Sequence, residues 1–162
     1  MPMISVGVGD IAVSDDGRGE IVTHALGSCL GITIWDPVAK VGGLLHAMLP
    51  NSAVDKNKAE KNPFMFVDTG VPQLFKKAYA LGADKKRIEL KVAGGASLRS
   101  SNSQDDLFKI GKRNAMVLKK LLWKNGVLIS SEDIGGEVSR TMKLDLSTGK
   151  VTLTILGKER EL

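Results

Sequence analysis

The sequence is poor in the residues that bind metals, form disulfides and stack on nucleic-acid bases. Its 162 residues include one cysteine, two histidines and only 4% aromatic residues. A single cysteine excludes an internal disulfide, and one cysteine with two histidines falls short of the usual ligand sets of structural zinc. We therefore expect no metal and no other cofactor, and a reducing compartment such as the cytoplasm.

The sequence also lacks a long hydrophobic run and a strong charge bias. Its apolar runs stop well short of the ~20 residues that span a bilayer, and no signal-peptide pattern opens the chain. Lysine and arginine outnumber aspartate and glutamate by 23 to 18, a net charge of +5. The basic stretches 56–61 and 85–87 contain or adjoin acidic residues and have no interleaved aromatics, so we expect neither nucleic-acid binding nor membrane insertion.

The pattern of apolar residues predicts an α+β fold. Residues 1–162 are expected to form a single domain with one core. Two segments have helical periodicity, from Asp68 to the glycine at 82 and from Ile110 to Asn125. Residues 51–62 are polar and without periodicity, and we expect a mobile surface loop there, either a lid over a site or a loop without function. Eight or nine short strands with two main helices favour packed mixed or antiparallel sheets, with the helices covering one face.

A β-hairpin carries the most informative residues. The apolar run 30–35 and the segment 41–49 flank an Asp36-Pro37 turn signal. If Trp35 and Lys40 close a four-residue loop, Cys29 lies directly opposite His46. A slip of one residue would turn each side chain to the other face. The pairing therefore depends on the turn.

A thiol beside an imidazole is the arrangement of cysteine hydrolases. The imidazole takes the thiol proton and later protonates a leaving group. His24 competes with His46 for this role, but would need the intervening turn to fold back. Thr23 is the candidate hydroxyl that accepts the ring N–H and orients it. The alternative is that Cys29 is a small buried hydrophobe and His46 a core histidine.

Three glycines and one serine beside these residues suggest an oxyanion and substrate-binding region. Gly27-Ser28 permits a tight turn whose backbone N–H groups point at an oxyanion. Gly42-Gly43 would let a substrate backbone approach closely. Asn114 lies on the apolar side of the second helix, so it either tethers a neighbouring loop or serves a site.

Several sequence blocks together resemble the chemoreceptor glutamine deamidase family, CheD. The resemblance covers nearly the whole chain, and its Leu26-Gly27-Ser28-Cys29 block with the histidine seventeen residues later is very specific. The other blocks follow in the family's order: Asp36-Pro37, residues 43–50, residues 91–96, Ile110-Gly111 with Asn114, Asp133 with Gly135-Gly136 and Arg140, and residues 148–151.

The resemblance implies hydrolysis of selected glutamine side-chain amides in methyl-accepting chemotaxis receptors. It assigns the nucleophile to Cys29, the base to His46 and the supporting hydroxyl to Thr23. Gly94 and Gly95 join the oxyanion and substrate-binding residues.

It also implies a fold related to a bacterial toxin deamidase and a CheC-type chemotaxis phosphatase as partner. We expect a monomer when the protein is unbound. Arg99 stands where the family pattern leads us to expect an aromatic residue, which affects partner or substrate contacts near residues 97–99. The rival reading is a non-catalytic adaptor that binds the receptor or the phosphatase.

Overall fold

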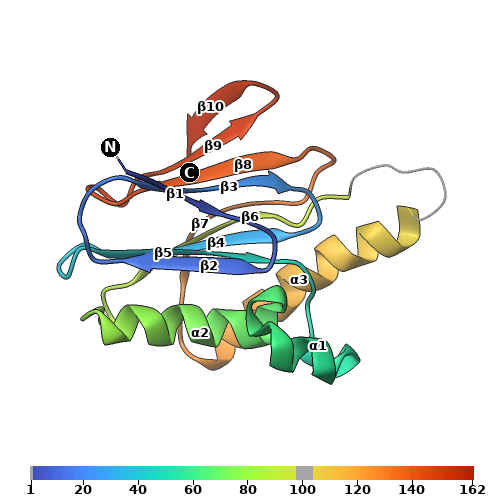
Figure 1. Ribbon diagram of the computed structural model, residues 1–162. Coiled ribbons are helices and arrows are strands. Elements are labelled where there is room, and N and C mark those ends of the chain that lie inside the picture. The colour runs from blue at the N-terminus through green and yellow to red at the C-terminus, as the bar shows by residue number, and fades with distance from the viewer. Residues whose placement is uncertain (1, 98–103) are drawn as a thin grey trace.

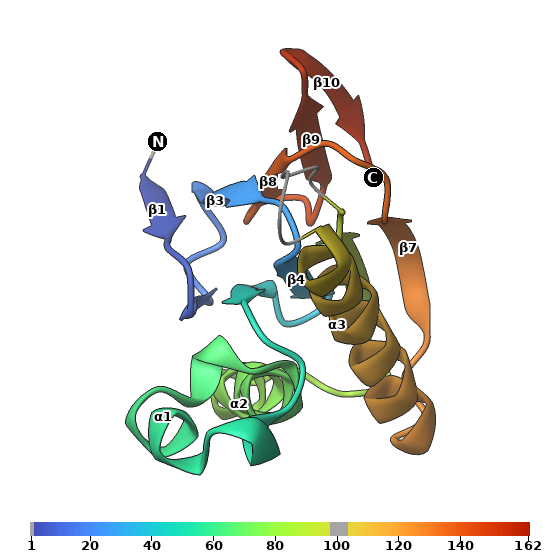
Figure 2. The ribbon, with the colours of Figure 1, turned by 90° about the vertical axis from the view of Figure 1, so that its right-hand side faces the viewer.

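Two sheets and a layer of helices are stacked in the computed structural model, which describes residues 2–97 and 104–162 (Figures 1 and 2). The elements are β1 (Met3–Val6), β2 (Asp10–Ser14), β3 (Glu20–Leu26), β4 (Leu30–Asp36), β5 (Val41–Ala47), η1 (Ser52–Val54), α1 (Lys56–Lys61), η2 (Pro63–Met65), α2 (Val67–Ala80), β6 (Glu89–Gly94), α3 (Gln104–Lys124), β7 (Ile129–Ile134), β8 (Arg140–Asp145), β9 (Val151–Ile155) and β10 (Lys158–Glu161).

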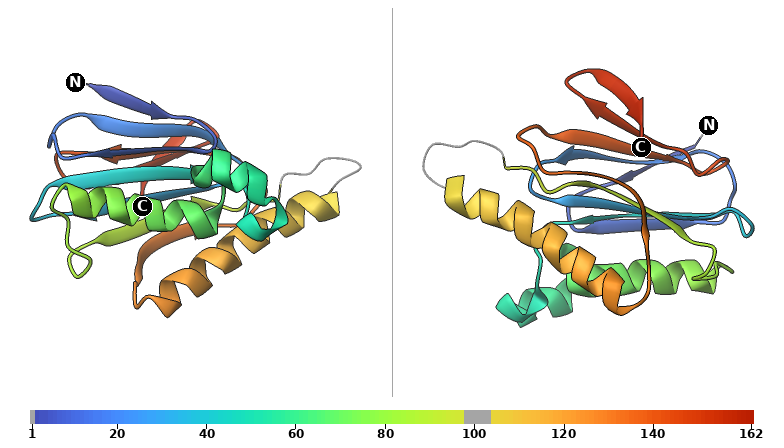
Figure 3. Two further views of the ribbon diagram at one scale, coloured as in Figure 1. Left: turned by 60° about the horizontal axis from the view of Figure 1, so that its bottom comes forward. Right: turned by 180° about the vertical axis from the view of Figure 1, so that it is seen from behind.

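Both sheets are mixed. The outer sheet has the order β1-β3-β8-β9-β10, and the central sheet has the order β2-β5-β4-β6-β7. Only the β1–β3 and β6–β7 pairs run parallel among the described strands. The predicted α+β class is confirmed, with α2 and α3 on the same side of the central sheet (Figure 3).

Alternating side chains of the central sheet pack into two separate hydrophobic layers, one on each face. Leu45 and Ala47 of β5 point to the helices and join the cluster that α2 and α3 complete. Leu44 points the other way and packs between the sheets with Ile21 and Met142. Because strand side chains alternate, His46 faces the layer between the two sheets.

The β4–β5 hairpin forms as predicted, but its register is shifted by two residues. Asp36 pairs with Val41, so the loop is 37–40, and His46 pairs with Gly31. Cys29 is therefore not directly opposite His46. A two-residue shift keeps every side chain on its face, and Cys29 and His46 remain diagonal neighbours.

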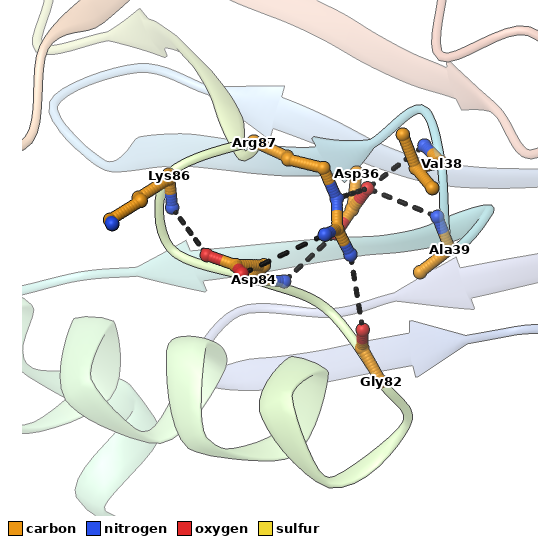
Figure 4. A network of polar contacts seen from close by, with 7 residues as sticks. All are labelled: Asp36, Val38, Ala39, Gly82, Asp84, Lys86 and Arg87. Atoms are coloured by element: carbon orange, nitrogen blue, oxygen red, sulfur yellow. Dashed lines mark hydrogen bonds and ion pairs between the residues drawn. The ribbon is translucent and has the colours of Figure 1, made fainter.

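A buried carboxylate sets this register (Figure 4). Asp36 Oδ1 accepts hydrogen bonds from the backbone N–H groups of Val38 (2.9 Å) and Ala39 (3.1 Å), and Oδ2 accepts one from Asp84 (2.8 Å). The Arg87 guanidinium also pairs with it, at 2.9 Å. Burial raises the pKa of Asp36, but Arg87 and these N–H groups outweigh it and hold that pKa far below its usual range. The turn is thus fixed at Asp36.

The predicted loop over residues 51–62 is wrong, because the segment folds into η1 and α1. Three polar side chains each accept a bond from a backbone N–H at a helix start: Asn51 from Ala53, Asp55 from Lys58 and Asn62 from Phe64. Caps of this kind stabilise the starts of short helices even where the sequence has no apolar periodicity. The Asn62 amide also donates to Gly9 O at 2.9 Å, which ties the segment to the β1–β2 turn.

The strand β10 was not predicted. All four residues are charged and exposed, so they show no alternation of apolar and polar positions. It pairs with β9 through a two-residue turn in which Leu156 and Gly157 both have positive φ, 51° and 77°. Such a turn matches the twist of a hairpin.

Candidate active site

Thr23 and His46 join the two sheets by a hydrogen bond. Thr23 lies on β3 of the outer sheet and His46 on β5 of the central sheet, and both are completely buried. Thr23 Oγ1 is 2.7 Å from His46 Nδ1 and 2.7 Å from the carbonyl oxygen of Val6. The imidazole is held in place by a short chain of polar atoms.

This chain of contacts determines which ring nitrogen carries the proton. A carbonyl oxygen only accepts, so the single hydroxyl hydrogen of Thr23 points at Val6 O. The hydroxyl oxygen must then accept from His46 Nδ1–H. In the neutral ring Nε2 therefore carries a lone pair and no proton.

Nothing in the described part of the chain hydrogen-bonds to His46 Nε2, although that atom is buried. Burial lowers the pKa of His46 to about 4, because the protonated ring would lose its hydration. At neutral pH the ring is thus uncharged, with Nε2 ready to accept a proton.

Cys29 follows a bulge at the end of β3. The pairs Thr23–Met142 and Leu26–Arg140 span three steps on β3 but two on β8, and Ala25 has a φ of 59°. The extra residue turns Leu26 inward and directs the chain toward Cys29. The Cys29 side chain is partly exposed and packs against the cluster between the sheets, on the side that His46 faces.

The relation between Cys29 and His46 is diagonal. His46 pairs with Gly31, two residues beyond Cys29. Diagonal strand neighbours have Cα atoms roughly 7–8 Å apart, with their side chains on one face. Burial raises the pKa of the Cys29 thiol by more than the hydrogen bond from its own backbone N–H lowers it, so the pKa lies above its usual value. At rest the pair is a thiol and a neutral imidazole, without charge separation.

Gly94 and Gly95 hold the backbone of Cys29. The N–H of Gly95 donates to Cys29 O at 2.9 Å, and the N–H of Ala96 donates to Gly27 O at 2.8 Å. Gly94 has a φ of 116°, and a Cβ there would lie 2.1 Å from Cys29 O. The Gly95 N–H is therefore already used in this structure and is not free to donate to an oxyanion. Both glycines serve close backbone packing instead.

Two further glycine predictions change with the structure. A Cβ on Gly43 would meet Leu74 and Val13 at 2.9 and 3.0 Å, so Gly43 faces α2 and not the site. Here the missing Cβ allows tight packing of β5 against Leu74 and Val13. The N–H of Gly27 donates to Ala25 O at 3.0 Å. The backbone N–H groups of Ser28 and Cys29 are the remaining candidates for an oxyanion.

His24 lies away from these residues. It is exposed on β3, and its nearest polar partner is the Thr141 hydroxyl at 3.4 Å. Residues 98 and 99, where an unusual Arg99 was noted, lie outside the described residues. Sequence reasoning missed the Val6 carbonyl, since a backbone atom leaves no signal in residue type.

Two negative findings concern only residues 2–97 and 104–162. No group of three or more His, Cys, Asp or Glu side chains is placed to hold a metal ion in residues 2–97 and 110–162, where the structure describes the side chains. In the same residues, no helix has the length and apolar character that crossing a membrane requires.

Fold and site together define a class of protein: a two-sheet α+β protein with a Thr–His pair joining the sheets beside its single cysteine. A family model described as CheD chemotactic sensory transduction matches residues 48–155. The chain belongs to the CheD family.

Its relatives share nearly its full length. A Syntrophus aciditrophicus protein named "Probable chemoreceptor glutamine deamidase CheD 1" is 49% identical over 95% of this chain and 94% of its own. A Solibacter usitatus protein, "Probable chemoreceptor glutamine deamidase CheD", is 43% identical over 100% and 94%. A Pyrococcus abyssi protein of that name is 49% identical over 93% and 90%. Among solved structures, Neisseria meningitidis protein NMB0706 matches with a TM-score of 0.47 and 12% identity over 84% of this chain and 63% of its own.

Proposed function

We propose that residues 1–162 form a single catalytic domain that hydrolyses selected glutamine side-chain amides of chemoreceptors to glutamates and releases ammonia. Membership in the CheD family and the names of the relatives support the substrate. The observation that carries the chemistry is the Thr23–His46 bond, which leaves a buried, unprotonated Nε2 facing the layer that Cys29 also lines.

In the first half of the reaction Cys29 is the nucleophile. His46 Nε2 takes the thiol proton as Sγ attacks the glutamine carboxamide carbon. The backbone N–H groups of Ser28 and Cys29 stabilise the resulting oxyanion. His46 then returns the proton to the nitrogen, the C–N bond breaks, ammonia leaves and a thioester remains.

In the second half His46 Nε2 takes a proton from water. The hydroxide attacks the thioester carbon, the C–S bond breaks, and the Cys29 sulfur regains its proton from His46. The product is a glutamate side chain. Both halves need the tautomer with the proton on Nδ1. Thr23 keeps the ring in this tautomer, because its hydroxyl accepts the Nδ1–H and Nε2 is left without a proton. No cofactor enters these steps.

Starting from a neutral thiol suits this mechanism. Burial raises the pKa of Cys29 and lowers that of His46, so neither partner is charged before substrate arrives. The proton moves only as the carbon–sulfur bond forms. This differs from a preformed thiolate–imidazolium pair, in which the thiol pKa is lowered.

We further propose that the protein acts in the cytoplasm, is a monomer when unbound and binds a CheC-type phosphatase as its partner.

The test is intact-mass analysis of receptor cytoplasmic fragments after incubation with the protein. Each converted amide adds the mass difference between a carboxylic acid and an amide. Cys29→Ala should abolish the change while the circular dichroism spectrum stays that of the wild type. A folded Cys29→Ala protein that still deamidates would overturn the mechanism. A wild-type protein that binds receptor or phosphatase without converting any amide would support the adaptor alternative.

A further inference from the structure

Asn114 links the segment that carries Cys29 to the segment that carries His46. It lies on α3 and is completely buried. Its amide nitrogen donates to Ser28 O at 2.9 Å and to Met48 O at 3.1 Å. Ser28 directly precedes Cys29, and Met48 comes two residues after His46.

The orientation of this amide follows from its partners. Both are carbonyl oxygens, which only accept, so the NH₂ group must face them. Both of its hydrogens are then used. The other end, Oδ1, is buried and has no hydrogen-bond partner in the part of the chain described. An unpaired buried acceptor is unfavourable. The side chain therefore makes the two NH₂ hydrogen bonds while its own carbonyl oxygen, Oδ1, stays without a partner.

The bridge lies where the pairing of β4 with β5 stops. The last pairs of β4 are Leu30–Ala47 on one side and Leu30–Gly94 on the other. Ser28 and Met48 lie just beyond these pairs, where no ladder fixes their separation. The Asn114 amide spans this open end with one hydrogen bond to each chain.

The helix that carries Asn114 is itself closely packed at this point. One turn earlier, a Cβ on Gly111 would lie 2.6 Å from Ala96 O and 2.8 Å from Gly95 O. Gly95 and Ala96 are the residues whose N–H groups hold Cys29 and Gly27. Asn114 therefore extends from a helix backbone that packs against Gly95 and Ala96, which in turn hold the Cys29 segment.

We propose that Asn114 is a positioning residue that sets the separation between Cys29 and His46. This rests on the proposed function, in which the thiol proton passes to His46 Nε2. Without the bridge the two segments separate at the end of the hairpin, and the thiol and imidazole lose their alignment. Misplacement by about 1 Å is enough to reduce a rate ~100-fold.

The experiment compares Asn114→Leu, which removes the amide at similar volume, with Asn114→Asp, which keeps the shape and supplies at most one hydrogen. The matched control is Asn125→Leu, just past the C-terminal end of the same helix, where the amide is exposed and donates to Leu121 O at 2.8 Å. Iodoacetamide alkylation reports on Cys29 alone, because the chain has one cysteine. Deamidation of receptor fragments gives kcat and KM separately.

We expect alkylation and kcat to fall by ~10- to 100-fold in Asn114→Leu. The loss should be at least as large in Asn114→Asp, because a carboxylate accepts hydrogen bonds and cannot donate to the two carbonyl oxygens. KM should change little. Asn125→Leu should match the wild type. In a His46→Ala background Asn114→Leu should cause no further loss of alkylation, because there is no longer an imidazole with which the Cys29 thiol must be aligned. Additivity of the two substitutions is the expectation for residues that act independently.

Full additivity, or wild-type alkylation in a folded Asn114→Leu protein, overturns the proposal. So does failure of both Asn114 variants to fold, which would assign the residue to the stability of the whole domain. The alkylation arm needs no receptor. If the wild type does not deamidate while Asn114→Leu still slows alkylation, the proposed function fails and the positioning role stands.

Discussion

His46 donates its Nδ1–H to the hydroxyl of Thr23 across the interface of the two sheets, at 2.7 Å. Because the same hydroxyl donates to Val6 O, the neutral ring is restricted to the tautomer in which Nε2 carries no proton. The catalytic proposal depends on this one relationship. It also connects three strands, since Val6, Thr23 and His46 lie on β1, β3 and β5.

Replacing Thr23 by valine tests this relationship directly, since the shape stays and only the hydroxyl is lost. Val6 O and His46 Nδ1–H would both lose their partner, so we expect a stability loss of ~1–3 kcal/mol and an activity loss of ~10- to 100-fold. Thr23→Ser should recover much of both. Deamidation assays and denaturant titration measure the two effects.

Thr33→Val is the matched control for this substitution. Thr33 is an equally buried strand residue whose hydroxyl donates to Lys91 O at 3.4 Å. It should lose some stability and no activity. If Thr23→Val retains wild-type activity, the site reduces to Cys29 and His46.

The two histidines should respond differently to alanine. His46→Ala removes the base, and we expect kcat to fall ~100- to 10,000-fold. His24→Ala should leave activity near that of the wild type, because His24 is exposed and contacts Thr141 and not the site. Receptor-fragment mass spectra over time give both rates. A larger loss from His24→Ala would contradict the assignment of the base.

The stability of the protein should depend on pH through His46. Folding lowers the pKa of His46 from 6.5 to about 4. Between these values the unfolded chain binds more protons than the folded one, so the free energy of unfolding falls as the pH falls. Its contribution is complete above pH 6.5 and is lost toward pH 4, on the order of 2–3 kcal/mol.

His46→Asn provides the comparison, because asparagine does not titrate and its amide nitrogen can donate to Thr23. Urea unfolding across this pH range should show a wild-type minus variant difference that declines between pH 6.5 and 4 and is constant above. A difference that stays constant throughout would mean that His46 is not buried as a neutral ring.

Gly94→Ala should damage the site through the backbone of Cys29. The new Cβ would lie 2.1 Å from Cys29 O, at a φ of 116°. We expect a loss of ~1–3 kcal/mol in stability and a slower alkylation of Cys29. Gly126→Ala is the control, with a φ of 68° and no atom within 4 Å of the new Cβ. It should lose stability through backbone strain alone, about 1–2 kcal/mol, with alkylation unchanged.

The sequence by itself determined the elements and the neighbourhood of the candidate residues. The alternation of strands, the helical periodicity from Val71 to Tyr79 and the Asp36-Pro37 turn signal are local properties, and the α+β fold followed from them. The blocks around Cys29 and His46 resembled the CheD family, and the comparisons confirm that membership.

Only the tertiary structure decided the register, the tautomer and the facing of the glycines. The hairpin closes at Asp36 because Asp84 and Arg87, far along the chain, bind its carboxylate. The proton position on His46 depends on Val6 O, a backbone atom of another strand. Gly43 faces α2, because packing between layers and not residue type decides what a glycine approaches. Asn114 was expected to need partners, but its choice of Ser28 O and Met48 O exists only after α3 docks on the central sheet.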